Sequence, residues 1–146
     1  MLTDKIPVKG KLHIVLKDSE GNIKDERHIT NLVVSTGLAH LTSRAIDATD
    51  AVMSHMAVGT DNTAAALGNT ALGTELARVS FDSNTDSGAV LTFVATFPAG
   101  TGTGALTEAG IFNAASSGTM FSRAVFSTVN KAASDIVEIT WTVTLG

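Results

Sequence analysis

The segment Ile136–Leu145 constrains the fold most strongly, because its side chains alternate between two kinds. One set is apolar and comprises Val137, Ile139, Trp141, Val143 and Leu145, whereas threonines and Glu138 dominate the other set. Successive side chains of a β-strand point to opposite faces of the sheet. The segment therefore predicts a strand with one core face and one hydroxyl face. We expect Trp141, Ile139 and Val143 to lie in the core, together with Phe93 and Phe97.

Seven further segments carry strand patterns and are separated by turn residues at a spacing of about 8–12 residues. These segments are Lys11–Lys17, Ile23–Ile29, Met53–Val58, Glu75–Ser83, Ala89–Phe97, Ala105–Asn113 and Thr119–Phe126. A single helix is predicted from Ser35 to Ala48, with Leu38, Leu41 and Ala45 on its apolar face. The predicted fold is all-β: a two-sheet, jelly-roll-like β-sandwich of about eight strands with one short helix.

No linker, repeat or low-complexity tract divides the chain of 146 residues. That length suits a single domain with one core. We therefore predict one β-sandwich domain over residues 11–146, preceded by a short polar N-terminal arm over residues 1–10.

The composition favours assembly with other proteins over binding to nucleic acid or membrane. Charged residues make up only 16% of the chain, and twenty threonines supply much of its polarity. A hydroxyl surface loses less on being covered than a charged surface does. The net charge of −4 comes without a basic patch, so we expect no nucleic-acid binding. No apolar stretch approaches the roughly 20 residues of a membrane helix, so we expect no membrane partner.

Motifs that would carry catalysis or bind a cofactor or metal are weak. The loop Asp82–Gly88 alternates oxygen-bearing side chains, but it lacks the glycine and the bidentate glutamate of a calcium loop and is better explained as a hairpin loop. The glycine run Gly100–Gly104 lacks the lysine of a phosphate loop. The four histidines sit singly in sequence, and surface roles are the default for His13 and His40. We therefore predict no catalytic residue, no cofactor and no metal site.

Glu108 interrupts the apolar run Ala105–Phe112, which is a predicted core strand. A carboxylate in such a place needs a partner, because burying an unpaired charge is costly. Arg78 and Arg123 are the available cations, each inside a predicted strand. The sequence predicts a structural ion pair between Glu108 and one of these two arginines, in preference to a catalytic acid.

Five strings in order along the chain resemble segments of small virion proteins of tailed bacteriophages. They are NLVVSTGL (Asn31–Leu38), HMAVGT (His55–Thr60), TALGTELAR (Thr70–Arg78), TEAGIF (Thr107–Phe112) and ITWTV (Ile139–Val143). The resemblance runs from about Lys11 to the C-terminus and includes proteins of the head-decoration and tail-fibre-base types. It implies a structural particle protein without enzymatic activity.

Within the particle, we expect a head decoration or cement protein, because a fibre protein would usually continue into a stalk. Such a protein would be made in the host cytoplasm, assemble as a dimer or trimer, and bridge subunits of the major capsid protein on the outer surface of the head. The alternative is a tail or baseplate subunit, or a tail-fibre-base adaptor. A carbohydrate-binding module is a third possibility, although the chain has one tryptophan and no tyrosine to form a sugar platform.

Overall fold

A computed structural model describes residues 7–46 and 49–146 of the chain. Its elements, in chain order, are β1 (Val8–Lys17), β2 (Ile23–Val33), α1 (Ser35–Ile46), β3 (His55–Gly59), β4 (Glu75–Ser80), β5 (Ser83–Ser87), β6 (Val90–Phe97), β7 (Gly104–Phe112), β8 (Met120–Lys131) and β9 (Ile136–Leu145). The all-β class and the single short helix are confirmed for the described residues. The strands number nine there, against the eight expected from the sequence.

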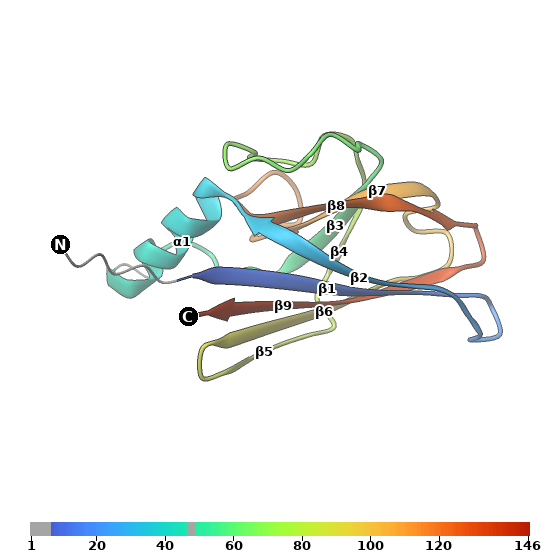
Figure 1. Ribbon diagram of the computed structural model, residues 1–146, viewed down its shortest axis with the longest axis horizontal. Helices are drawn as coiled ribbons and strands as arrows, with labels where there is room; N and C mark the ends of the chain where they lie inside the picture. Colours follow the sequence, from blue (N-terminus) through green and yellow to red (C-terminus); the bar gives the residue numbers. More distant parts are fainter. Residues whose placement is uncertain (1–6, 47–48) are drawn as a thin grey trace.

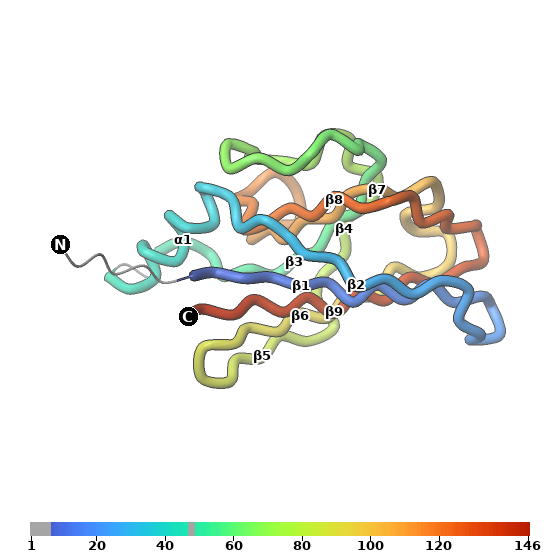
Figure 2. Tube along the Cα trace, in the orientation of Figure 1, coloured from blue at the N-terminus to red at the C-terminus, as the bar shows by residue number. Residues whose placement is uncertain are grey.

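The nine strands form one antiparallel sheet in the order β4-β3-β7-β8-β2-β1-β9-β6-β5. The sheet curls so that its two halves face each other across the core (Figure 1), and the chain trace in Figure 2 shows the same arrangement. Strand β2 joins the halves, because most of it pairs with β1 while Leu32 and Val33 at its end pair with Arg123 and Ser122 of β8. The halves are therefore continuous through two residue pairs.

The two edge strands, β4 and β5, are consecutive in the chain and bring the edges of the curled sheet together. Only Phe81 and Asp82 separate them. The amide of Phe81 donates to Ser54 O, just before β3, and the amide of Asp82 donates to Val94 O of β6. The link between the edge strands is thus bonded to both halves.

Strand β5 corrects the interpretation of the segment Asp82–Gly88. This segment is neither a calcium loop nor a hairpin loop: Ser83–Ser87 is a strand paired with β6. The turn follows it, because Ser87 pairs with Val90 and only Gly88 and Ala89 lie between them. Gly88 has a φ of 59°, which a two-residue hairpin turn requires and glycine tolerates.

The N-terminal boundary also shifts. β1 begins at Val8, so Val8, Lys9 and Gly10 pair with β9 as part of the sheet and not as part of an arm. Residues 1–6 of the predicted arm lie outside the described residues. The last two residues of the predicted helix, Asp47 and Ala48, also lie outside them.

Helix α1 packs on the sheet with only part of its predicted apolar face, because Leu41 contacts the core whereas Ala45 is exposed. Gly37 and His40 are its buried residues, whereas Leu38 is 41% exposed. The reason is a close backbone contact: a Cβ on Gly37 would lie 2.0 Å from the carbonyl oxygen of Phe121 in β8. Only glycine allows the helix to approach this strand so closely. The surface role expected of His40 is therefore wrong, and burial lowers the pKa of its imidazole. At 12 residues, α1 is also too short to cross a membrane, and it is the only helix in the described chain.

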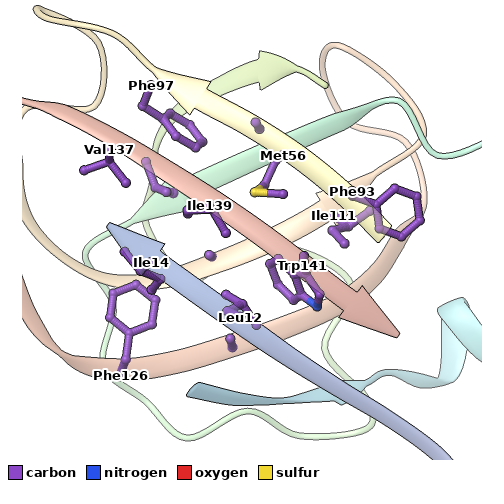
Figure 3. Packing of buried hydrophobic residues seen from close by; sticks show 14 of the residues in the cluster. Leu12, Ile14, Met56, Phe93, Phe97, Ile111, Phe126, Val137, Ile139 and Trp141 are labelled. Atoms are coloured by element: carbon purple, nitrogen blue, oxygen red, sulfur yellow. The ribbon is translucent and has the colours of Figure 1, made fainter. Parts of the chain in front are cut away.

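The core between the two sheet halves is apolar, and Figure 3 shows its packing. The predicted core residues are confirmed: Trp141, Ile139, Val143 and Phe97 are fully buried, and Phe93 is 6% exposed. Leu12 and Ile14 of β1 pack beside β9, and Met56 and Ile111 come from the opposite half. The alternation along β9 thus faces one continuous core.

Replacing Trp141 with alanine should lower the free energy of unfolding by about 3–5 kcal/mol, the usual loss for a large buried aromatic side chain. Thr142→Ala is the matched control, because Thr142 lies next in the same strand on the outer face. It should cost less than about 1 kcal/mol. Chemical denaturation of both variants measures these losses. Equal losses would contradict the assignment of the two faces.

Candidate functional site

The connection between β3 and β4 is a loop of fifteen residues, 60–74, that contains no helix or strand. Loops of this length without regular structure are uncommon in compact domains and usually have a function. This loop, drawn in green in Figure 1, covers the outer face of the sheet half formed by β3, β7 and β8. It is the candidate functional site, and we call it the 60–74 loop.

Part of the 60–74 loop is held by a small second core. Leu72 packs with Val34, Ala57, Phe112 and Met120 on the side of the sheet opposite the main core. Strand β7 is therefore buried on both faces from Leu106 to Phe112. This double burial explains why β7 is almost continuously apolar.

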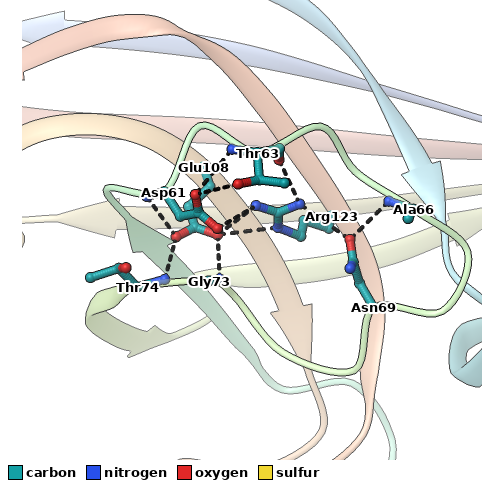
Figure 4. A network of polar contacts seen from close by, with 8 residues as sticks. All are labelled: Asp61, Thr63, Ala66, Asn69, Gly73, Thr74, Glu108 and Arg123. Carbon is teal, nitrogen blue, oxygen red and sulfur yellow. Dashed lines mark hydrogen bonds and ion pairs between the residues drawn. The ribbon is translucent and has the colours of Figure 1, made fainter.

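Glu108 of β7 lies under the same loop and is fully buried. Its Oε1 accepts hydrogen bonds from the amide of Gly73 at 2.8 Å and from Nε of Arg123 at 3.1 Å. Its Oε2 accepts from the amides of Asp61 at 3.0 Å and Thr74 at 2.8 Å. A carboxylate offers about four lone-pair sites, so these four bonds use its whole capacity (Figure 4).

Arg123 of β8 is the cation that neutralises Glu108, and its side chain is 2% exposed. Its Nη1 donates to the carbonyl oxygen of Thr63 at 3.0 Å and to Oδ1 of Asn69 at 3.1 Å. Its Nη2 lies 3.1 Å from Oε1 of Glu108 and 3.6 Å from Oδ2 of Asp61. Nη2 has no hydrogen bond of good geometry among the described residues, so it contributes through charge. The guanidinium thus binds the middle part of the loop, at Thr63 and Asn69, while Glu108 binds both of its ends.

Asp61 adds a second carboxylate to this network. Its Oδ1 accepts from the amide and the hydroxyl of Thr63, at 3.0 and 2.9 Å. These bonds, the amide bond first, hold the pKa of Asp61 below its usual value, and the charge of Arg123 lowers it further. Gly73 packs against the same side chain, and a Cβ there would lie 1.7 Å from Oδ2 of Asp61. Asp61 therefore fixes the loop from within.

Of the two arginines considered as partners of Glu108, the structure places only Arg123 against it. Arg78 of β4 instead forms a bidentate pair with Glu75, at 2.7 and 3.1 Å. Its Nη1 donates to the carbonyl oxygens of Ala114 and Ser117, both at 2.9 Å, and its guanidinium lies 3.7 Å from the ring centroid of Phe112. Arg78 thus stabilises the turn between β7 and β8 and takes no part in binding Glu108.

The other residues in the network escaped sequence analysis for a simple reason. Gly73 and Thr74 contribute backbone amides, and Thr63 contributes a carbonyl oxygen to Arg123, so their side-chain identities give little warning. Only Asp61 and Thr63 offered a pattern that sequence analysis could have used, because Asp followed two residues later by Thr favours a local side-chain turn.

The glycine run near Gly102 is a turn, with Gly100 and Gly102 at positive φ.

This arrangement is built to hold a loop. The lone pairs of Glu108 are all occupied, and Arg123 is shielded from solvent, so neither group is placed to exchange a proton with a substrate. What the pair achieves is to give an irregular loop a single shape.

Comparisons with protein-family models, with curated proteins and with solved structures find no match to this chain.

Glu108→Gln should lower the free energy of unfolding by about 3–5 kcal/mol, the range for breaking a buried ion pair from one side. The amide would remove the carboxylate nearest to Arg123, leaving only Asp61 at 3.6 Å as a counter-charge. It would also direct an NH₂ group at backbone amides that need an acceptor. Denaturant titration measures the loss.

The control is Glu20→Gln, in the exposed β1–β2 turn, where almost no change is expected. Similar losses in the two variants would refute the structural role of the pair.

Proposed function

We propose that this protein is a non-enzymatic structural subunit of a tailed-bacteriophage particle. More specifically, we propose that it is a decoration or cement protein on the outer surface of the head, where it bridges subunits of the major capsid protein. It would act there as a dimer or trimer. In this proposal the two halves of its curled sheet are the two layers of a jelly-roll-like sandwich. The resemblance of its sequence strings to small virion proteins motivates this assignment.

The observation that supports a binding role is the fixed conformation of the 60–74 loop. A protein surface binds more tightly when its shape is fixed beforehand, because less conformational entropy is lost on association. The buried pair of Glu108 and Arg123 fixes this loop through five bonds to its residues. The loop also presents an apolar side chain, since Leu67 is 54% exposed. A rigid loop with an exposed apolar side chain is suited to contact another protein.

The outer face of β9 and its neighbour β6 supports the same role. Thr142 pairs with Thr92 across the two strands, and Thr140 and Thr144 pair with Val94 and Val90. Apart from Glu138, the residues on this face of the two strands are uncharged, so a partner can cover most of it without stripping water from ions. Many identical copies around a shell would multiply a modest contact.

Two alternatives belong to other classes. A tail or baseplate subunit, or a tail-fibre-base adaptor, would use the same surfaces on a different partner. A carbohydrate-binding module is disfavoured because Trp141, the chain's one tryptophan, is fully buried and offers no stacking surface.

The test uses phage particles that lack this protein, to which purified protein is added back. Wild-type protein should bind depleted heads and raise the temperature at which they release DNA. Leu67→Glu should weaken this binding at least about tenfold, as expected for a contact worth about 1.4 kcal/mol or more. The matched control is Ile23→Glu, which alters an equally exposed side chain (59%) at the far hairpin.

The outcomes separate the proposals. Depleted particles with normal heads that lose tails or fail to adsorb would reject the cement role in favour of the tail role. Protein that binds neither heads nor tails would reject the virion role altogether. Equal weakening by the two glutamate variants would reject the 60–74 loop as the contact surface.

A further inference from the structure

The β1–β2 hairpin brings together two histidines that are fifteen positions apart in sequence. His13 of β1 and His28 of β2 are direct cross-strand partners. Their rings are stacked with centroids 4.5 Å apart and an angle of 5° between the planes. The two histidines sit singly in sequence, and it is the register of the hairpin that makes them neighbours. Directly opposed side chains of antiparallel strands are close enough to share a ligand.

Glu26 completes a convergent group on the same face of the hairpin. Its Oε1 lies 2.6 Å from Nε2 of His13 and 4.0 Å from Nε2 of His28. The three ligand atoms all lie within 4.8 Å of one another. The Nε2 atoms of both imidazoles thus lie near the same carboxylate oxygen, and His13 is hydrogen-bonded to it.

This donor set of two imidazoles and one carboxylate suits a transition-metal ion. Zinc takes imidazole nitrogen and carboxylate oxygen at about 2.0–2.2 Å, which places tetrahedral ligand atoms about 3.4 Å apart. The distances of 2.6 and 4.0 Å lie on either side of that value. The side chains of His13, Glu26 and His28 are 40%, 45% and 77% exposed, so the two imidazoles are free to rotate out of their parallel stack and point both nitrogens at one ion.

The backbone beneath the three side chains is well supported. β1 is the neighbour of both β2 and β9 and is hydrogen-bonded to them along its length. Lys11, two residues before His13, lines a surface groove together with His13 and His28. Its positive charge is a modest cost at this exposed face, because water and salt screen it.

We propose that His13, Glu26 and His28 form a surface site for a divalent transition-metal ion of the zinc class. The chain supplies three ligands and leaves a fourth position open to water or to a side chain of another protein. This proposal does not depend on the virion role. The competing explanation is a surface hydrogen bond between His13 and Glu26 with His28 stacked on it, and metal titration distinguishes the two.

The experiment titrates ZnCl₂ into the tag-free full-length protein at neutral pH, followed by calorimetry and by NMR of the histidine ring protons. The proposal predicts one equivalent bound and shifts of the His13 and His28 signals, with those of His40 and His55 unchanged. Absence of saturable binding at millimolar zinc would overturn it.

Three variants test the ligands one at a time. His13→Ala, His28→Ala and Glu26→Gln should each weaken zinc binding at least about tenfold, since even groups that only orient a ligand have that effect. Glu20→Gln, in the turn of the same hairpin, is the matched control and should bind zinc like the wild type. Zinc affinity unchanged in both histidine variants would also overturn the proposal. Because all four positions are exposed, circular dichroism should show that each variant remains folded.

Discussion

The structure depends on how one buried ion pair obtains the hydrogen bonds that its two charged groups need. Glu108 and Arg123 face each other across β7 and β8 on the outer side of the sheet, where water would normally solvate them. The 60–74 loop excludes that water, so the loop itself must supply the missing hydrogen bonds. It does so with three amides, one carbonyl oxygen and one side-chain amide. The pair and the loop therefore require each other: without the loop the charges would be exposed, and without the charges the loop amides would lack acceptors.

The same pair lies at the point where the two halves of the sheet join. Arg123 is the register partner of Leu32, one of the two β2 residues that pair with β8. Its neighbour Ser122 pairs with Val33, and Phe121 meets the backbone of α1 at Gly37. The junction of the halves, the seat of the helix and the anchor of the loop thus occupy three consecutive residues of β8. This proximity links the shape of the 60–74 loop to the curvature of the whole sheet.

The sequence predicted those features of the structure that the pattern of side chains determines by itself. It could not predict contacts that depend on the register between strands or on backbone groups. The alternation of β9 identified its core face, and the position of Glu108 in an apolar run required a cation nearby. The sequence left the choice between Arg78 and Arg123 open, because both lie in strands and only pairing decides which is near. β5 was missed because all five of its residues are polar and exposed, as an edge strand allows. His13 and His28 became neighbours only through hairpin register.

Hydrogen–deuterium exchange of individual loop amides tests the central claim most directly. The amides of Asp61, Gly73 and Thr74 donate to Glu108, so they should exchange slowly in the wild-type protein even though the loop has no regular structure. In Glu108→Gln they should exchange much faster, under conditions in which the amides of β9 remain protected. Fast exchange of these three amides in the wild-type protein, or unchanged protection in the variant, would contradict the account.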